Sequence, residues 1–177
     1  MTGGGIPPHH PYPSPRHGDT GFDPGEHRGA LGNEFHPGCH DPGDLFNRQE
    51  RRIADRLVTE GASVHPRRRD DTVERKKNPD AMVRTGPDDA GTVTEFKHLD
   101  EPGTATLRRA IVNAGRQVAP YGGGDAVIDA RDVELTAVDA RRGYARAVGQ
   151  AKAHGQTMPN RVVIMLADGL ILTLPEV

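Results

Sequence analysis

Hydrophobic periodicity alternates between helix-like and strand-like from residue 47 onward, and this alternation restricts the fold more than any other feature. Apolar residues recur at helical spacing over 47–61, over 104–118 and from 136 onward. Short β-prone runs lie between these segments, and the final pattern of VVIML, ADG and LILTL is typical of a β-hairpin. The predicted order is α-β-β-β-α-β-α-β-β. It favours the α/β class, with a mixed central β-sheet flanked by helices.

The first 43 residues have a different character. They hold six of the nine histidines and most of the 15 prolines, and they show almost no apolar periodicity. Such a segment has too little apolar surface to offset the entropy lost on folding. We therefore predict an irregular Pro/Gly/His-rich arm or linker over 1–43 and a folded domain over 44–177.

Charge, cysteine content and hydropathy exclude several classes of protein. The net charge is −2, so any contact with nucleic acid must come from local basic patches. The single cysteine, Cys39, excludes an internal disulfide. No stretch approaches 18 apolar residues, which predicts no membrane span, and the N-terminus lacks the apolar core of a signal peptide. If the protein leaves its cell, we expect it to travel as the end of a longer polypeptide.

Two predicted strands, 80–85 and 92–97, carry charged residues at adjoining ends. Asp80 opens the first strand, and Glu95 and Lys97 close the second on one face, because strand side chains alternate. Antiparallel pairing through the GPDDAG loop would bring the three side chains together. Carboxylates are preferred ligands of Mg²⁺ or Mn²⁺, and a lysine can hold an attacking water. The alternative is that these are solvated strand ends and that Glu95 and Lys97 form an ordinary ion pair.

Glu50 adds a third carboxylate. It follows Phe46 by four residues and precedes Ile53 by three, so it projects from the apolar face of the first helix toward the sheet. The alternative is a capping box, in which Asn47 is the N-cap and Glu50 its partner at the third helical position. The two roles are compatible.

These residues together resemble the PD-(D/E)xK nuclease superfamily. The motif consists of Pro79-Asp80, the E-F-K run that ends in Lys97, and the helix acid Glu50. The segments NPDAMV…GTVTEFK and GGGDAVIDARDVELTAVDARRGYARA, with the final hairpin, are similar to the C-terminal tRNA nuclease domains of CdiA-type contact-dependent growth inhibition toxins. This resemblance covers roughly residues 46–175.

The resemblance implies a metal-dependent endonuclease that cleaves tRNA in a competing bacterial cell. It implies that Asp80, Glu95 and Glu50 bind the metal and that Lys97 acts on the water. It also implies a cognate immunity protein as partner, and delivery from the producing bacterium into the target-cell cytoplasm as the end of a larger toxin. The scaffold also fits a DNA endonuclease, and a non-catalytic interaction module stays open as a third alternative.

Two departures from the family pattern are visible. The VENN-type junction that often precedes such domains is absent. A Gln-x-x-x-Tyr element, which some relatives carry on the helix after the E-x-K motif, corresponds to Gln117 and Tyr121, but Pro120 interrupts it.

Basic residues outside the motif are candidates for RNA backbone contacts, since Lys and Arg commonly bind phosphate. One group lies in the predicted exposed loop RRRDDTVERKKN, and the other forms a stripe on the third helix. His98, beside Lys97, is a further candidate phosphate donor. The basic candidates are Arg67, Arg68, Arg69, Lys76, Lys77, Arg142 and Arg146.

A second metal pattern occurs in the arm. His36, Cys39 and His40 are potential Zn²⁺ ligands, but no fourth ligand is evident, and structural zinc sites use four. The expected cofactor is therefore a divalent metal at the carboxylates, Mg²⁺ or Mn²⁺, with Zn²⁺ as the alternative.

Overall fold

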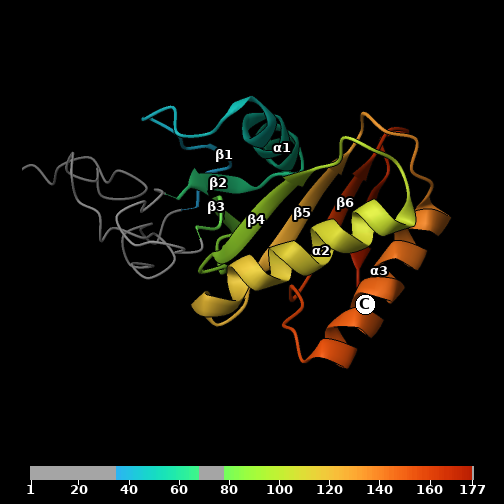
Figure 1. Cartoon of the computed structure of the whole chain (residues 1–177). Coiled ribbons are helices and arrows are strands. Elements are labelled where there is room, and N and C mark those ends of the chain that lie inside the picture. The colour runs from blue at the N-terminus through green and yellow to red at the C-terminus, as the bar shows by residue number, and fades with distance from the viewer. Residues whose placement is uncertain (1–34, 68–77, 177) are drawn as a thin grey trace, which may run out of the picture.

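The computed structural model describes residues 35–67 and 78–176, and in this part of the chain it confirms the predicted α/β class (Figure 1). Seven strands form one sheet, three α-helices flank it, and a short 3-10 helix follows α2. The elements in chain order are β1 (Gly38–Cys39), α1 (Arg48–Thr59), β2 (Ser63–Pro66), β3 (Ala81–Arg84), β4 (Thr92–His98), α2 (Thr104–Val118), η2 (Ala119–Tyr121), β5 (Asp125–Ala130), α3 (Ala137–His154), β6 (Val162–Leu166) and β7 (Ile171–Leu174).

The spatial order of the strands follows the sequence from β1 to β7. Strands β2, β3 and β4 are antiparallel, β4, β5 and β6 are parallel, and β7 returns antiparallel to β6. Helices α2 and α3 make the crossovers between the parallel strands and lie together on one face, whereas α1 covers the other (Figure 1). No described helix is long and apolar enough to cross a membrane.

Hydrophobic clusters hold these layers together. The largest lies under α2 and α3 and includes Leu107, Ile111, Ile128 and Ile164. A second lies under α1, where Ile53 is 1% exposed and packs with Phe96 and neighbouring strand residues. A small third cluster joins Val118 at the end of α2 to Met82 and Val93. Burying an aliphatic side chain of this size stabilises the fold by roughly 1.5–3 kcal/mol, so these clusters fix where each helix sits on the sheet.

Sequence at the helix ends explains where the helices begin. Asn47 caps α1, as predicted, and accepts from the backbone N–H groups of Gln49 and Glu50 at 2.9 Å each. At the start of α2, Gly103 occupies the N-cap position with φ at +112°, where a side chain is disfavoured, and Thr104, a residue type that often caps helices, is already helical.

Helix α3 begins as predicted after Thr136, whose hydroxyl accepts from the Asp139 N–H at 3.1 Å. The Thr136 hydroxyl also donates to the Asp139 carboxylate at 2.7 Å, so these two side chains bond to each other at the start of the helix. Ala140, Ala147 and Ala151 are buried against the core, whereas Val148 is 40% exposed.

The last residues of the predicted N-terminal arm contribute a strand to the sheet. Within residues 35–43, Gly38 and Cys39 form the short edge strand β1, which pairs parallel with β2. Residues 1–34 of the predicted arm lie outside the described part of the chain.

Candidate active site

Asp80 lies where β3 begins beside the longer strand β4. Its carboxylate Oδ2 accepts from the backbone N–H of Phe96 at 2.8 Å. The side chain thus accepts a hydrogen bond that a backbone carbonyl of a neighbouring strand would otherwise accept. Ala81 of β3 pairs with Thr94 of β4, and continuing this register by one residue sets Asp80 opposite Glu95. The predicted convergence of the two strand ends is therefore present.

Glu95 lies on the face of β4 that α2 covers, and it is 1% exposed. Its Oε1 forms an ion pair with the Lys97 ammonium group. Its other oxygen, Oε2, is buried and receives no N–H donor among the described residues, while the Asp80 carboxyl group forms a side-chain hydrogen bond with Glu95. A buried carboxylate oxygen that no N–H group reaches is costly, so this oxygen is suited to receive a cation.

The two carboxylates hold protons unusually well. Burial, followed by the nearby Glu95 charge, raises the pKa of Asp80 to about 8. Burial also raises the pKa of Glu95, although the Lys97 ammonium opposes this shift. A side-chain hydrogen bond from Asp80 likewise lowers the pKa of Glu95, so the two acids are coupled. Coupled carboxyl groups buried in a low-dielectric site are a feature of catalytic and metal-binding centres.

Lys97 is held from two sides. Besides its ion pair with Glu95, its Nζ donates to the side-chain oxygen of Gln117 at 3.0 Å. Gln117 belongs to the last turn of α2, so the helix that crosses over β4 fixes the lysine that β4 carries. The Gln-x-x-x-Tyr element therefore reaches the candidate site through its glutamine.

Tyr121, the second residue of that element, contacts Arg67. The Arg67 guanidinium lies over the Tyr121 ring, 4.2 Å from its centroid, and the arginine is 6% exposed. Burial lowers the pKa of Arg67, whereas Tyr121, Asp80 and Glu95 raise it. The prediction that Arg67 belongs to an exposed loop is wrong, because its backbone N–H extends the sheet by bonding to the Asp80 carbonyl at 2.9 Å.

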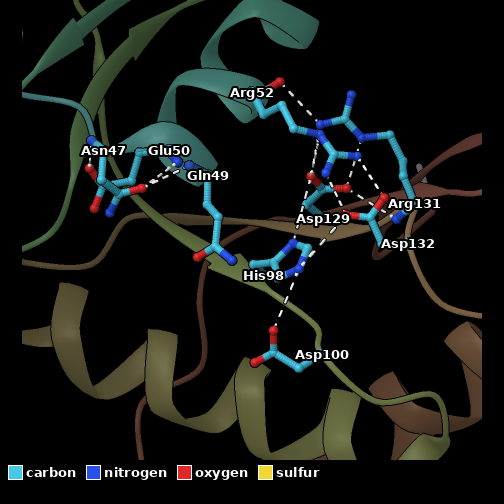
Figure 2. A network of polar contacts seen from close by, with 9 residues as sticks. All are labelled: Asn47, Gln49, Glu50, Arg52, His98, Asp100, Asp129, Arg131 and Asp132. Carbon is cyan, nitrogen blue, oxygen red and sulfur yellow. Dashed lines mark hydrogen bonds and ion pairs between the residues drawn. The ribbon is translucent and has the colours of Figure 1, made fainter.

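Glu50 takes the capping role that its position predicts. Its Oε2 accepts from the Asn47 backbone N–H at 2.9 Å, which completes the capping box (Figure 2). It also lines the same cavity as Asp80, and its charge contributes to the raised pKa values of Asp80 and Glu95.

A cavity of about 240 Å³ lies between the start of α1, the end of β2 and the start of β3. Glu50, Arg67 and Asp80 line it together with apolar side chains.

The donor set suits a divalent metal at Asp80 and Glu95. Both are hard oxygen ligands, and Glu95 offers a buried oxygen that no N–H group among the described residues reaches. In residues 35–67 and 78–176, no group of three or more His, Cys, Asp or Glu side chains is close enough to hold a metal ion. Glu50 therefore lies near the pair without forming a three-carboxylate cluster with it. The same finding covers the predicted zinc pattern of His36, Cys39 and His40.

The remaining basic candidates lie elsewhere. Arg142 pairs with Asp139 at 3.5 Å, and Arg146 donates to Thr104 at the start of α2. Thr104 is about 20 Å along the helix axis from Gln117, so this end of α3 is remote from the carboxylates. Arg68, Arg69, Lys76 and Lys77 lie outside the described residues.

His98 faces away from Lys97, as strand alternation requires. It lies on the α1 face, where Asp129, Arg131, Asp132 and Arg52 form a charge network (Figure 2). Asp129 is 1% exposed and accepts from the Arg131 guanidinium at 2.7 and 2.8 Å. This network ties α1 to the ends of β4 and β5, so His98 is part of a structural cluster in the described fold.

Asp88 and Asp89, in the loop between β3 and β4, stay outside the site. Asp89 accepts from the backbone N–H groups of Thr85 and Gly91 at 2.8 Å each, which are contacts of a turn.

Comparisons with known proteins give one distant structural likeness. No family model and no curated protein matches the sequence. A chain from a solved structure described as "CdiA-CT/CdiI toxin and immunity complex from Burkholderia pseudomallei" is similar at 16% identity with a TM-score of 0.43. The match covers 80% of this chain and 96% of that chain. A likeness this distant assigns neither a family nor a function.

Proposed function

We propose that this protein is a metal-dependent endonuclease of the PD-(D/E)xK type and that its substrate is RNA, with tRNA as the expected class. The observation that carries the proposal is the buried pair Asp80 and Glu95 beside Lys97. Glu95 has a buried oxygen that no N–H group among the described residues reaches, and the lysine ammonium is fixed by two contacts. A purely structural ion pair would not require the second buried carboxylate, whose burial is unfavourable.

In this proposal Asp80 and Glu95 hold the metal, and Glu50 adds negative charge at its edge. When bound, the metal supplies Lewis-acid stabilisation of the charge that develops on a phosphate oxygen. Lys97 donates a hydrogen bond to the attacking water and orients its lone pair toward phosphorus. The water oxygen forms the new bond to phosphorus, and the bond from phosphorus to the leaving oxygen breaks with its electron pair going to that oxygen. The attacking water releases a proton to solvent, and solvent protonates the leaving oxygen.

Gln117 acts through Lys97 as a positioning residue. Its carboxamide oxygen accepts from Nζ at 3.0 Å and limits the directions in which the ammonium can point. Arg67 balances the charge of the carboxylate pair from the β2 side. The arrangement thus places one cation on each side of two carboxylates.

The deciding experiment incubates the full chain with Mg²⁺ and, separately, with a tRNA pool and with plasmid DNA. We expect RNA cleavage that EDTA stops, and a loss of at least about 100-fold in Glu95→Gln and Lys97→Ala, the size of loss seen when one electrostatic contact to a transition state is removed. Lys152→Ala, an exposed change on α3, is the matched control. Full activity in either site variant would refute the mechanism, and cleavage of plasmid alone would reassign the substrate to DNA.

We further propose that the protein is a toxin of the contact-dependent growth inhibition kind, delivered as the end of a larger secreted protein and neutralised by an immunity protein. This step depends on the sequence resemblance. Expression in a bacterial cytoplasm should arrest growth, and co-expression of the small open reading frame directly downstream should restore it. Growth without arrest by an active nuclease would refute the toxin assignment.

A further inference from the structure

The cavity beside Asp80 has a composition that binding of a metal and a phosphate does not require. Its lining combines two kinds of residue: the apolar Leu45, Phe46, Pro66 and Pro79, and the polar or charged Glu50, Arg67, Asn78 and Asp80. A site that contacted only the sugar–phosphate backbone would favour cationic and hydrogen-bonding groups. Apolar side chains mixed with polar ones beside a catalytic carboxylate suit a flat group that has apolar faces and polar edges.

The cavity volume restricts the occupant. At about 240 Å³ it is smaller than the pockets of about 300–1,000 Å³ that enclose drug-sized ligands. It therefore has room for one ring system and not for two stacked nucleotides. Its rim reaches solvent, since the Leu45 side chain is 45% exposed, whereas Phe46 is 6% exposed and packs against Phe96 at a centroid distance of 5.8 Å. The wall is thus rigid on the inside and accessible on the outside.

The charged lining fixes how a nucleotide would enter. Asp80 is both a cavity residue and one of the two carboxylates, so the cavity reaches the proposed metal-binding pair through Asp80. Arg67 lines the cavity as well, and its guanidinium lies 4.2 Å from the centroid of the Tyr121 ring. A phosphate at the carboxylates would place its neighbouring base within reach of the apolar walls.

We propose that this cavity receives the nucleobase adjoining the scissile phosphate. The inference rests on the proposed nuclease function and names the part of the substrate that this site holds. A base can enter only when it is unstacked, so the pocket selects single-stranded loops, bulges or ends over continuous duplex. Contact with an apolar or aromatic wall is tolerant of base identity, since every base has a hydrophobic face.

Binding, measured without cleavage, tests the proposal. The full chain carrying Glu95→Gln, which cannot turn over, is titrated with a labelled single-stranded RNA by fluorescence anisotropy in Mg²⁺. The same RNA is then prepared with one abasic site at each successive position. We expect one position at which loss of the base weakens binding about tenfold, within the range measured for base stacking on protein side chains.

A double-mutant cycle that combines a substitution in the protein with a missing base in the RNA identifies the pocket. Leu45→Ala should weaken binding of the intact RNA about fivefold and have no further effect when the sensitive base is missing, because both changes remove one contact. Leu170→Ala is the matched control, since Leu170 is 44% exposed in the turn between β6 and β7. Its effect should be below twofold with either RNA.

The outcomes separate the pocket from the nuclease assignment. Independent effects of Leu45→Ala and of every abasic site would overturn the pocket, even if the wild-type protein cleaves RNA. Coupling at one position, combined with a wild-type protein that does not cleave RNA, would support a nucleobase pocket and overturn the nuclease assignment. Absence of RNA binding would overturn both.

Discussion

Asp80→Asn should make the protein more stable while removing the proposed activity. Asparagine has the same shape as aspartate, and its side-chain oxygen can still accept from the Phe96 N–H, which Asp80 does at 2.8 Å. What the substitution removes is the need to bury a second acid beside Glu95. A residue retained for binding a metal is expected to be unfavourable for the fold in the absence of that metal.

The pH dependence follows from the raised pKa of Asp80. Burial and the Glu95 charge raise it from 3.8 to about 8, so between these limits the folded protein binds a proton that the unfolded chain has released. Stability of the wild type therefore falls as pH rises through this window, by at most about 1.4 kcal/mol per pH unit from this group. Since water entering the adjoining cavity relieves part of the burial cost, we expect about half, roughly 2–3 kcal/mol at pH 8.

Urea unfolding of both proteins at pH 5 and pH 8, in EDTA, measures the difference. Asp80→Asn should exceed the wild type by roughly 2–3 kcal/mol at pH 8 and by only about 1.5 kcal/mol at pH 5, with a melting temperature raised by about 4–12 °C at pH 8. Asp88→Asn is the matched control, because it removes the same charge from an exposed turn. An equal gain at both pH values, or no gain at pH 8, would refute the burial argument.

Three further predictions concern packing, charge and metal. Gly143→Ala should destabilise the fold by about 1–3 kcal/mol in urea unfolding, because the added Cβ would lie 2.8 Å from Leu107 Cδ2, whereas Gly149→Ala on the same helix has open space and should stabilise by about 0.5–1 kcal/mol. Asp129→Ala should cost about 3 kcal/mol, since it leaves a guanidinium without its buried carboxylate, and a loss below 1 kcal/mol would contradict this. Saturating Mn²⁺ at about 100 times its Kd should stabilise the wild type by about 3 kcal/mol, whereas Asp80→Asn should not respond.

Local sequence patterns predicted those parts of the site that lie on adjacent strands. Strand alternation placed Glu95 and Lys97 on one face, and a short loop between the strands brought Asp80 beside Glu95. Helical periodicity placed Glu50 next to this pair and also predicted its capping box. Each of these inferences uses neighbours within one helix or one strand pair, where geometry is set by a few residues.

Contacts between elements that are distant in the sequence could not be predicted from these local patterns. Arg67 belonged by composition to a charged loop, and only the length of β2, which carries the sheet to the Asp80 carbonyl, places it in the interior. The network around Asp129 joins α1 to the ends of two strands, and no periodicity indicates which arginine of a basic helix such a carboxylate will meet. Helix and strand patterns predict faces, whereas these pairings depend on how far each element extends.

The end of α2 fixes both cations of the candidate site. Gln117 accepts from Lys97, and Tyr121, four residues later, lies under Arg67. The chain then passes close beneath β4 at Gly124, where an added Cβ would lie 2.3 Å from the Val93 carbonyl oxygen. Because only glycine permits this approach, Gly124 sets the position of η2 relative to β4, and with it the distance between the two cations. A β-carbon at that position would move Tyr121 and Gln117 together, so the geometry around the two carboxylates depends on a residue that touches neither of them.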